Sequence, residues 1–144
     1  MSNMNLLKKR IFIVEDNASN STIMKILLQA SGAVVFNDRF AINTLERIHD
    51  AGAIDLIIMD LMLSNHTSGY DVYDQIKKDP TLSSIPAVVV SASDPALELN
   101  KARNKGFVGY ITKPINNQTF SRMIASILEG KQVWADDFSE FEHQ

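Results

Sequence analysis

The sequence predicts an α/β protein built on one parallel β-sheet, and three observations carry this prediction. Five short apolar runs alternate along the chain with five segments of helical periodicity. The run at 56–59, Leu-Ile-Ile-Met, contains no polar residue, which is typical of a strand buried on both faces of a parallel sheet. It ends on Asp60, and open parallel sheets bind their ligands beyond the carboxyl ends of the strands. A functional site is therefore expected around Asp60.

Bulk composition narrows the class of protein. The chain has 144 residues, which fits one domain, and with 45% hydrophobic and 22% charged residues it can bury a core. A net charge of −3 gives no general attraction to nucleic acid or anionic membrane. The absence of cysteine excludes disulfides and thiolate metal sites and fits a cytoplasmic protein. The first apolar run, 11–14, is too short for a signal peptide or a membrane span.

The first strand is predicted at 11–14, after a frayed lead-in at 1–9. The helix that follows is expected to be capped by Asn17 or Ser19 and to end near Gly32. Its expected inward face has helical spacing and consists of Ile23, Ile26, Leu27 and Ala30. These features predict a first strand–helix unit.

A second strand is predicted at 33–36 and a third at 55–60, and Gly52 ends the helix between them. The inward residues of that helix are expected to be Ala41, Leu45 and Ile48. A polar loop, 64–69, follows the third strand and is rich in turn-forming residues. The pattern repeats the first strand–helix unit.

The second half of the chain continues the alternation. A helix with Val72, Tyr73 and Ile76 on one side ends before Asp79-Pro80, and a strand follows at 87–90. Asp94 and Pro95 begin the next helix as N-cap and first residue, and Gly106 ends it. The fifth strand is predicted at 108–111. The last helix ends before Gly130, with its inward residues at Phe120, Met123, Ile124 and Ile127.

Residues 1–130 are predicted to form the domain, and 131–144 an acidic and aromatic tail. In the tail, Trp134, Phe138 and Phe141 fall at i, i+4 and i+7. This spacing predicts a short amphipathic helix that docks on the domain or on a partner. The alternative is a partly disordered acidic end.

Polar residues follow the strands at the edge where a parallel sheet carries its site. These residues are Glu15 and Asp16 after the first strand, Asp60 after the third, Ser91 after the fourth and Lys113 after the fifth. Three carboxylates at one edge repel each other, and a divalent cation with oxygen ligands, Mg²⁺, would make them compatible. A carboxylate can also act as a nucleophile and form an acyl phosphate. We therefore expect Asp60 to carry a phosphoryl group, with Lys113 neutralising its charge.

This ordered set resembles the receiver domain of the two-component response-regulator family over residues 10–130. The motifs that carry the resemblance are Glu15-Asp16, Asp60, Ser91-Ala92 and Lys113-Pro114. The resemblance implies a flavodoxin-like, doubly wound sheet of five parallel strands in the order 2-1-3-4-5, with five helices. Asp16 and Asp60 would then meet at the switch point of the sheet.

The family pattern also implies a role for each site residue. Asp60 would be the phosphoacceptor and, with Glu15 and Asp16, a ligand of Mg²⁺. The backbone carbonyl of Met62 would complete the protein ligands.

Three further residues would respond to the phosphoryl group. Ser91 would bond a phosphoryl oxygen, and Lys113 would pair with the phosphate and help to hold Asp60. Tyr110 would be the aromatic switch residue that moves between exposed and buried positions.

The resemblance implies a stand-alone, single-domain response regulator in the cytoplasm, not an enzyme. A histidine kinase or histidine phosphotransfer protein would donate the phosphoryl group. A downstream protein would read the face formed by the fourth helix, fifth strand and fifth helix. Nucleic acid and membrane are not expected partners, and the oligomeric state stays open, a phosphorylation-dependent dimer included.

Three departures from the family pattern surround Asp60. Ser64 stands where proline is usual, and Gly69 comes ninth after the acceptor where the family has glycine eighth. Glu15 replaces the commoner aspartate.

Two alternatives stay open. One is a pseudo-receiver that binds partners without phosphorylation, against which the intact acceptor, serine and lysine argue. The other is a small flavodoxin-like or hydrolase-like enzyme. An aspartyl-phosphate phosphatase would place a second aspartate where Met62 stands, and a mononucleotide site would need a Gly-rich loop after the first strand.

Overall fold

The structure, a computed structural model, describes residues 4–38, 43–63 and 67–135. Its strands are β1 (Arg10–Val14), β2 (Val34–Asp38), β3 (Leu56–Met59), β4 (Ala87–Ser91), β5 (Gly109–Thr112) and β6 (Val133–Trp134). Its helices are α1 (Ala18–Ala30), α2 (Thr44–Ala51), α3 (Gly69–Lys78), α4 (Pro95–Lys105) and α5 (Phe120–Leu128). The strands form one sheet in the order β2-β1-β3-β4-β5-β6, in which every adjacent pair is parallel. The predicted order 2-1-3-4-5 is confirmed, and β6 adds a strand at its outer edge.

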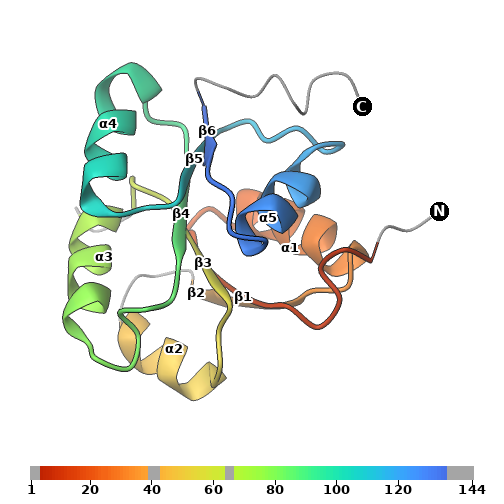
Figure 1. Cartoon of the computed structure of the whole chain (residues 1–144), viewed down its shortest axis with the longest axis horizontal. Coiled ribbons are helices and arrows are strands. Elements are labelled where there is room, and N and C mark those ends of the chain that lie inside the picture. The colour runs from red at the N-terminus through yellow and green to blue at the C-terminus, as the bar shows by residue number, and fades with distance from the viewer. Residues whose placement is uncertain (1–3, 39–42, 64–66, 136–144) are drawn as a thin grey trace.

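Helices cover both faces of the sheet, as the unbroken apolar strands require. Figure 1 shows α2, α3 and α4 on one side and α1 and α5 on the other. Successive strand residues alternate between the two resulting cores: Val14 and Met59 pack on the α2–α4 side, and Ile13 and Ile58 on the α1–α5 side. Because both faces are buried, the polar residues that follow the strands meet at one open edge.

The inward face predicted for α1 is wrong. Ile23 and Ile26 are 44% and 60% exposed, whereas the buried residues of the helix are Ser21, Met24 and Leu28. The helix carries two overlapping apolar stripes, and the sheet buries the one centred on Met24; of the predicted face, Leu27 alone packs partly against the core, and Ala30 is exposed. Its predicted cap is confirmed, since the Asn17 side chain accepts a hydrogen bond from Asn20 N at 2.9 Å.

The lead-in is anchored, contrary to prediction, in its described part. Leu6 is completely buried, and its backbone N–H donates to the Ser31 carbonyl at 3.0 Å. Gly32 adopts φ 98°, and a Cβ there would lie 2.8 Å from Leu7 Cα. Glycine is therefore needed at position 32, where the chain packs directly against the backbone of its own N-terminal segment.

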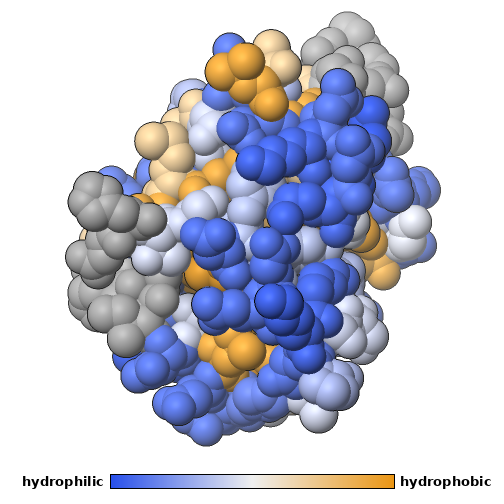
Figure 2. Space-filling view, turned by 90° about the vertical axis from the view of Figure 1, so that its left-hand side faces the viewer, coloured by the Kyte–Doolittle hydropathy of each residue, from blue (hydrophilic) through white to orange (hydrophobic). Residues whose placement is uncertain are grey.

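The remaining helices follow the predicted pattern. Asp94 caps α4 by accepting from Ala96 N at 2.9 Å, and Gly106 ends the helix at φ 111°. In α2, Ile48 is buried and Leu45 is half-buried, while Ala41 lies outside the described residues. The outer face of α2–α4 is mostly hydrophilic, with a few hydrophobic spots (Figure 2). Among the described residues, no helix is long and apolar enough to cross a membrane.

Val133 and Trp134 make up β6, so the described beginning of the predicted tail is a strand. Both side chains are buried, at 2% and 9% exposure. Phe138 and Phe141, the other members of the predicted stripe, lie outside the described residues. Up to residue 135 the chain after α5 thus continues the β-α-β alternation, and a helix in the rest of the tail stays a prediction.

Candidate phosphoacceptor site

The expected site residues converge at the carboxyl edge of the sheet. Val14 pairs with Met59, so the residues that follow them, Glu15 and Asp60, are neighbours. The Asp60 N–H donates to the Val14 carbonyl at 3.1 Å and fixes the strand end. Lys113 follows β5 directly, and its N–H donates to the Ser91 carbonyl at 3.0 Å. The sheet register therefore brings together groups that are far apart in the chain.

Lys113 joins the two carboxylates. Its ammonium donates to Glu15 Oε1 and, at 2.9 Å, to Asp60 Oδ2. The side chains are only 11%, 1% and 7% exposed for Lys113, Glu15 and Asp60, so water screens these charges little. Burial lowers the pKa of the Lys113 ammonium, but the hydrogen bonds and charges of the two carboxylates outweigh it and raise that pKa overall. Lys113 is therefore a permanent cation at the acceptor.

The acidic groups fit a divalent cation. Glu15, Asp16 and Asp60 each offer an oxygen, and these oxygens lie within 4.8 Å of one another. Burial, followed by the nearby Asp60 carboxylate, raises the pKa of Glu15 from 4.5 to about 7, against the opposing effect of Lys113. The single ammonium of Lys113 therefore does not neutralise all of the negative charge of these carboxylates. A set of hard oxygen donors with surplus negative charge suits Mg²⁺.

We expect Mg²⁺ to bind more weakly as the pH falls below about 7. Glu15 must lose its proton to ligate the metal, so below its pKa of about 7 the affinity should fall by up to about tenfold per pH unit. Calorimetric titration between pH 5.5 and 8 measures this slope. Glu15→Gln should bind weakly at every pH and lose most of the slope; an unchanged slope in this variant would assign the proton to another group.

The loop after Asp60 closes tightly onto it. Met62 N donates to Asp60 Oδ1 at 3.1 Å, and Met62 forms an antiparallel bridge with Ser68. A Cβ on Gly69 would lie 2.1 Å from the Asp60 carbonyl oxygen, so α3 begins directly against the acceptor's backbone. The Met62 carbonyl remains a predicted metal ligand, and Ser64 lies outside the described residues. Although the loop is one residue longer than the family pattern, α3 still begins against the backbone of Asp60, and this close packing requires glycine at position 69.

Ser91 and Tyr110 are linked through Ser93. Ser91 is completely buried, and its Oγ donates to Ser93 Oγ and accepts from Ser93 N, both at 3.2 Å. Tyr110 is also fully buried, and its hydroxyl donates to the Ser93 carbonyl at 3.0 Å. Tyr110 therefore lies in the inward of its two expected positions, and Ser91 is engaged within its own loop.

Asp38 and the Tyr70–Glu98 pair were missed by sequence reasoning. Asp38 is a fourth carboxylate at this edge, but Thr44 Oγ1 donates to it at 2.5 Å and Arg47 lies 3.7 Å away, so its role is to hold α2. The sequence shows Asp38 as a polar residue after the second apolar run, but it was not considered as a site residue. The Tyr70 hydroxyl donates to Glu98 Oε2 at 2.7 Å and ties α3 to α4. No local pattern pointed to this pair.

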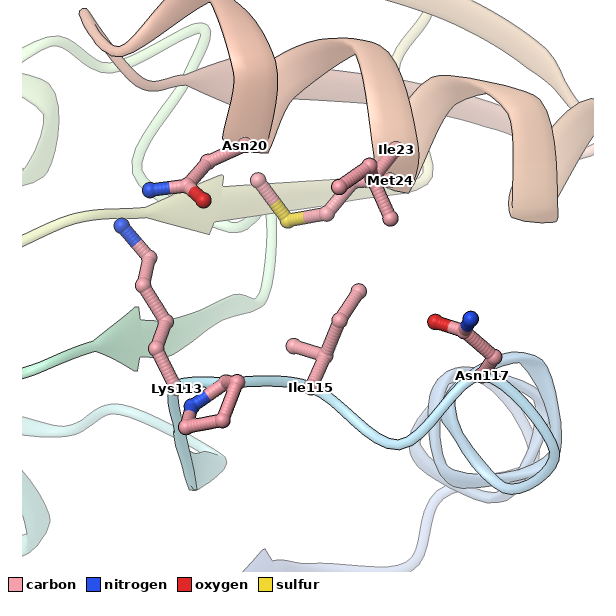
Figure 3. Close-up of a pocket in the computed structure, with 7 residues that line it drawn as sticks. Asn20, Ile23, Met24, Lys113, Ile115 and Asn117 are labelled. Atoms are coloured by element: carbon pink, nitrogen blue, oxygen red, sulfur yellow. The ribbon is translucent and has the colours of Figure 1, made fainter.

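A cavity of about 230 Å³ opens beside Lys113, between α1 and the loop after β5. Asn20, Ile23 and Met24 come from the helix, and Ile115 and Asn117 from the loop (Figure 3). Ile115 points toward Ile23 and Met24 across the cavity, while Asn20 lies near the Lys113 ammonium (Figure 3). An apolar surface therefore adjoins the charged site.

Comparison with known families agrees with this geometry. Residues 11–125 match the family model described as the response regulator receiver domain. The polar-differentiation response regulator DivK of Brucella ovis is 33% identical over 122 residues, which cover 85% of this chain and 98% of that protein. The DivK protein of Brucella anthropi matches at the same identity and coverage.

Solved structures show the same architecture. The phosphorylated cyanobacterial phytochrome response regulator RcpA is 29% identical, with a TM-score of 0.69 over 85% of this chain and 92% of that one. A receiver domain protein of Methanospirillum hungatei shares the fold at 23% identity, with a TM-score of 0.75 over 85% of this chain and 95% of its own. This chain therefore shares its fold with response regulators of known structure.

Proposed function

This chain belongs to the response-regulator receiver family, and on that basis we propose that it accepts a phosphoryl group on Asp60 from a histidine kinase or histidine phosphotransfer protein. Members of this family act in two-component signalling and are conventionally not classed as enzymes. The observation that carries the proposal is that Lys113 forms ion pairs with both Asp60 and Glu15, and that all three side chains are almost completely buried.

The chemistry is an exchange of one bond to phosphorus. An Asp60 carboxylate oxygen forms the new O–P bond, and the donor's N–P bond breaks, its electron pair leaving with the imidazole nitrogen. Lys113 holds Asp60 Oδ2 and remains beside the transferred group as a fixed positive charge. Bound Mg²⁺ at Glu15, Asp16 and Asp60 would supply further neutralisation of the phosphoryl oxygens.

The response would begin at Ser91. Its hydroxyl would leave Ser93 and donate to a phosphoryl oxygen, and Tyr110, whose hydroxyl donates to the Ser93 carbonyl, would repack. The face formed by α4, β5 and α5 would change its affinity for a downstream protein, as expected of a two-state element biased by a local charge. A phosphorylation-dependent dimer is one form that this response can take.

The phosphodonor would approach over the cavity beside Lys113. Ile23 and Ile26 are exposed apolar residues on α1, and the cavity between α1 and the β5–α5 loop adjoins the acceptor. Exposed apolar surface next to a charged site is suited to protein contact. We place this exchange in the cytoplasm, where a kinase and its phosphorylated histidine would be available.

Intact-mass measurement tests the proposal. Incubation with acetyl phosphate and Mg²⁺ should add one phosphoryl group that is labile to base. Asp60→Asn should abolish the adduct, whereas Asp71→Asn, at an exposed position on α3, should retain it. A chain that takes up no phosphoryl group from acetyl phosphate or from phosphoramidate would be a pseudo-receiver instead.

A further inference from the structure

A groove of about 450 Å³ lies along the first turns of α4, between this helix and the chain that follows β6. Its apolar wall consists of Pro95, Ala96 and Leu99 of the helix and of Ala135, the first residue after β6. An apolar cavity of about 150 Å³ is already enough to hold a benzene molecule. The groove is therefore large enough for an aromatic side chain.

The chain leaves β6 beside this groove, because β6 ends at the edge of the sheet at which α4 begins (Figure 1). The Arg103 guanidinium, on the turn of α4 that follows Leu99, lies 4.5 Å from the centre of the Trp134 ring. The next residue, Ala135, lines the groove and packs against the apolar core on the α4 side. Whatever follows Ala135 therefore begins at the groove.

The first aromatic residue after Ala135 is Phe138. Three residues of extended chain span about 10 Å, whereas the rise along the helix from Pro95 to Leu99 is about 6 Å. Phe138 can thus reach every part of the groove. Because it is tethered to a residue of the groove wall, its effective concentration there is in the millimolar range, and docking needs far less affinity than a separate peptide would.

The charges of the tail and of α4 are complementary. Residues 136–144 contain four carboxylates and neither lysine nor arginine, whereas Lys101 and Arg103 are exposed on α4. Asp94 also lines the groove, but its side chain caps its own helix by accepting from Ala96 N at 2.9 Å. An acidic segment with one aromatic residue therefore fits this part of the helix, with the ring in the groove and the carboxylates toward the basic side chains.

We propose that residues 136–144 dock on α4, with Phe138 in the groove between the helix and Ala135 and with the neighbouring carboxylates toward Arg103. The spacing of aromatic residues left open whether the tail docks on the domain or on a partner, and the position of the groove favours the domain. The docking does not depend on phosphorylation of Asp60, so its test is separate from that of the proposed function. A protein that binds this part of α4 would have to compete with the tail.

Disulfide trapping tests the docking on the full chain, because the chain has no cysteine of its own. A disulfide requires Cα atoms about 4.4–6.8 Å apart, so its rate of formation reports close approach. The test pair combines Asn100→Cys, at the groove, with Ser139→Cys, the residue after Phe138. The control pair combines the same Ser139→Cys with Gln118→Cys, at an exposed position just before α5.

We expect the Asn100 pair to close faster than the Gln118 pair. Adding Phe138→Ser to the Asn100 pair should slow closure about tenfold, the effect of losing one buried aromatic side chain, whereas adding Phe141→Ser should change it little. Equal rates in the two pairs, or a rate that Phe138→Ser does not change, would overturn the docking. Disulfides that join two molecules would assign the groove to a second copy of the chain and would overturn it as well.

NMR spectra of chains without engineered cysteines provide a second measurement. The backbone amide signals of Leu99, Asn100 and Ala135 should shift between the parent and Phe138→Ser, because the docked ring is a neighbour of the groove. The matched variant Phe141→Ser should leave these signals near their parent positions. Unchanged signals in Phe138→Ser, or shifts confined to Phe141→Ser, would refute the proposal.

Discussion

Replacing Lys113 with methionine is expected to destabilise the metal-free protein by about 3 kcal/mol at pH 8, because a buried charge is left without its partner. Lys113 donates to both Glu15 and Asp60, which are almost completely buried. Without the ammonium, the two carboxylates face each other in a poorly solvated site. Urea unfolding of the parent and the variant, with a chelator present, measures the loss.

The loss should shrink on acidification. The pKa of Glu15 is about 7 in the folded protein against 4.5 as its ordinary value, so the fold binds this proton more tightly than the unfolded chain does. Stability from this group is therefore fully present below about pH 4.5 and is lost as the pH rises through 7. At pH 5 the protonated Glu15 removes one of the two facing charges, and Lys113→Met should cost less there than at pH 8.

A double variant separates charge from packing. Adding Glu15→Gln to Lys113→Met should recover much of the stability, because only Asp60 then remains charged and unpaired. Lys131→Met, at an exposed position, should change the free energy of unfolding by no more than about 0.5 kcal/mol. If Lys113→Met lowered the free energy of unfolding equally at both pH values and Glu15→Gln did not change this loss, the packing of the lysine stem would be its cause.

The sheet and its acidic edge were predictable because both depend on short-range sequence features. An unbroken apolar run such as 56–59 can only be buried on both faces, and the residue that follows it must lie at the strand end. Parallel strands all end at one edge, so the meeting of Asp60 with Lys113 followed from topology. The α4 boundaries likewise follow from Asp94 and Gly106, whose cap roles are local.

Other features depend on competition between tertiary contacts, which spacing does not reveal. Two stripes on α1 are apolar, and only the shape of the sheet surface decides that Met24 is buried and Ile26 exposed. Trp134 has helical spacing to two later aromatics, but the open edge of β5 pairs with it as a strand. The Ser91–Ser93 and Tyr70–Glu98 contacts depend on loop and side-chain positions that periodicity does not describe.

Gly69→Ala is expected to destabilise the protein by about 3 kcal/mol, as severe overpacking does. Alanine in a helix is ordinarily more favourable than glycine, so propensity alone predicts the opposite sign. Here the new Cβ would lie 2.1 Å from the Asp60 carbonyl oxygen and 3.0 Å from Leu61 Cα. Both contacts are with backbone, which cannot turn aside as a side chain can. Thermal and urea unfolding measure the loss.

The same substitution should slow phosphorylation of whatever protein remains folded. Relief of the contact requires the backbone of Asp60 to move by about 1 Å, a displacement that can cost about a hundredfold in rate. Such a shift would strain the 2.9 Å hydrogen bond to Lys113 and the 3.1 Å bond from Met62 N. Intact-mass time courses with acetyl phosphate, run below the melting temperature, measure the rate.

Ser68→Ala is the matched control at the adjacent residue. The Ser68 side chain caps α3 by accepting from Tyr70 N at 3.1 Å, so its loss should cost about 1 kcal/mol. It adds no atom near Asp60, and its phosphorylation rate should stay near that of the parent. Equal loss of rate in both variants would mean that the start of α3, and not the contact of Gly69 with Asp60, positions the acceptor. A rate lost only in Gly69→Ala would show that the longer loop works because its glycine lets α3 begin against the phosphoacceptor's own backbone.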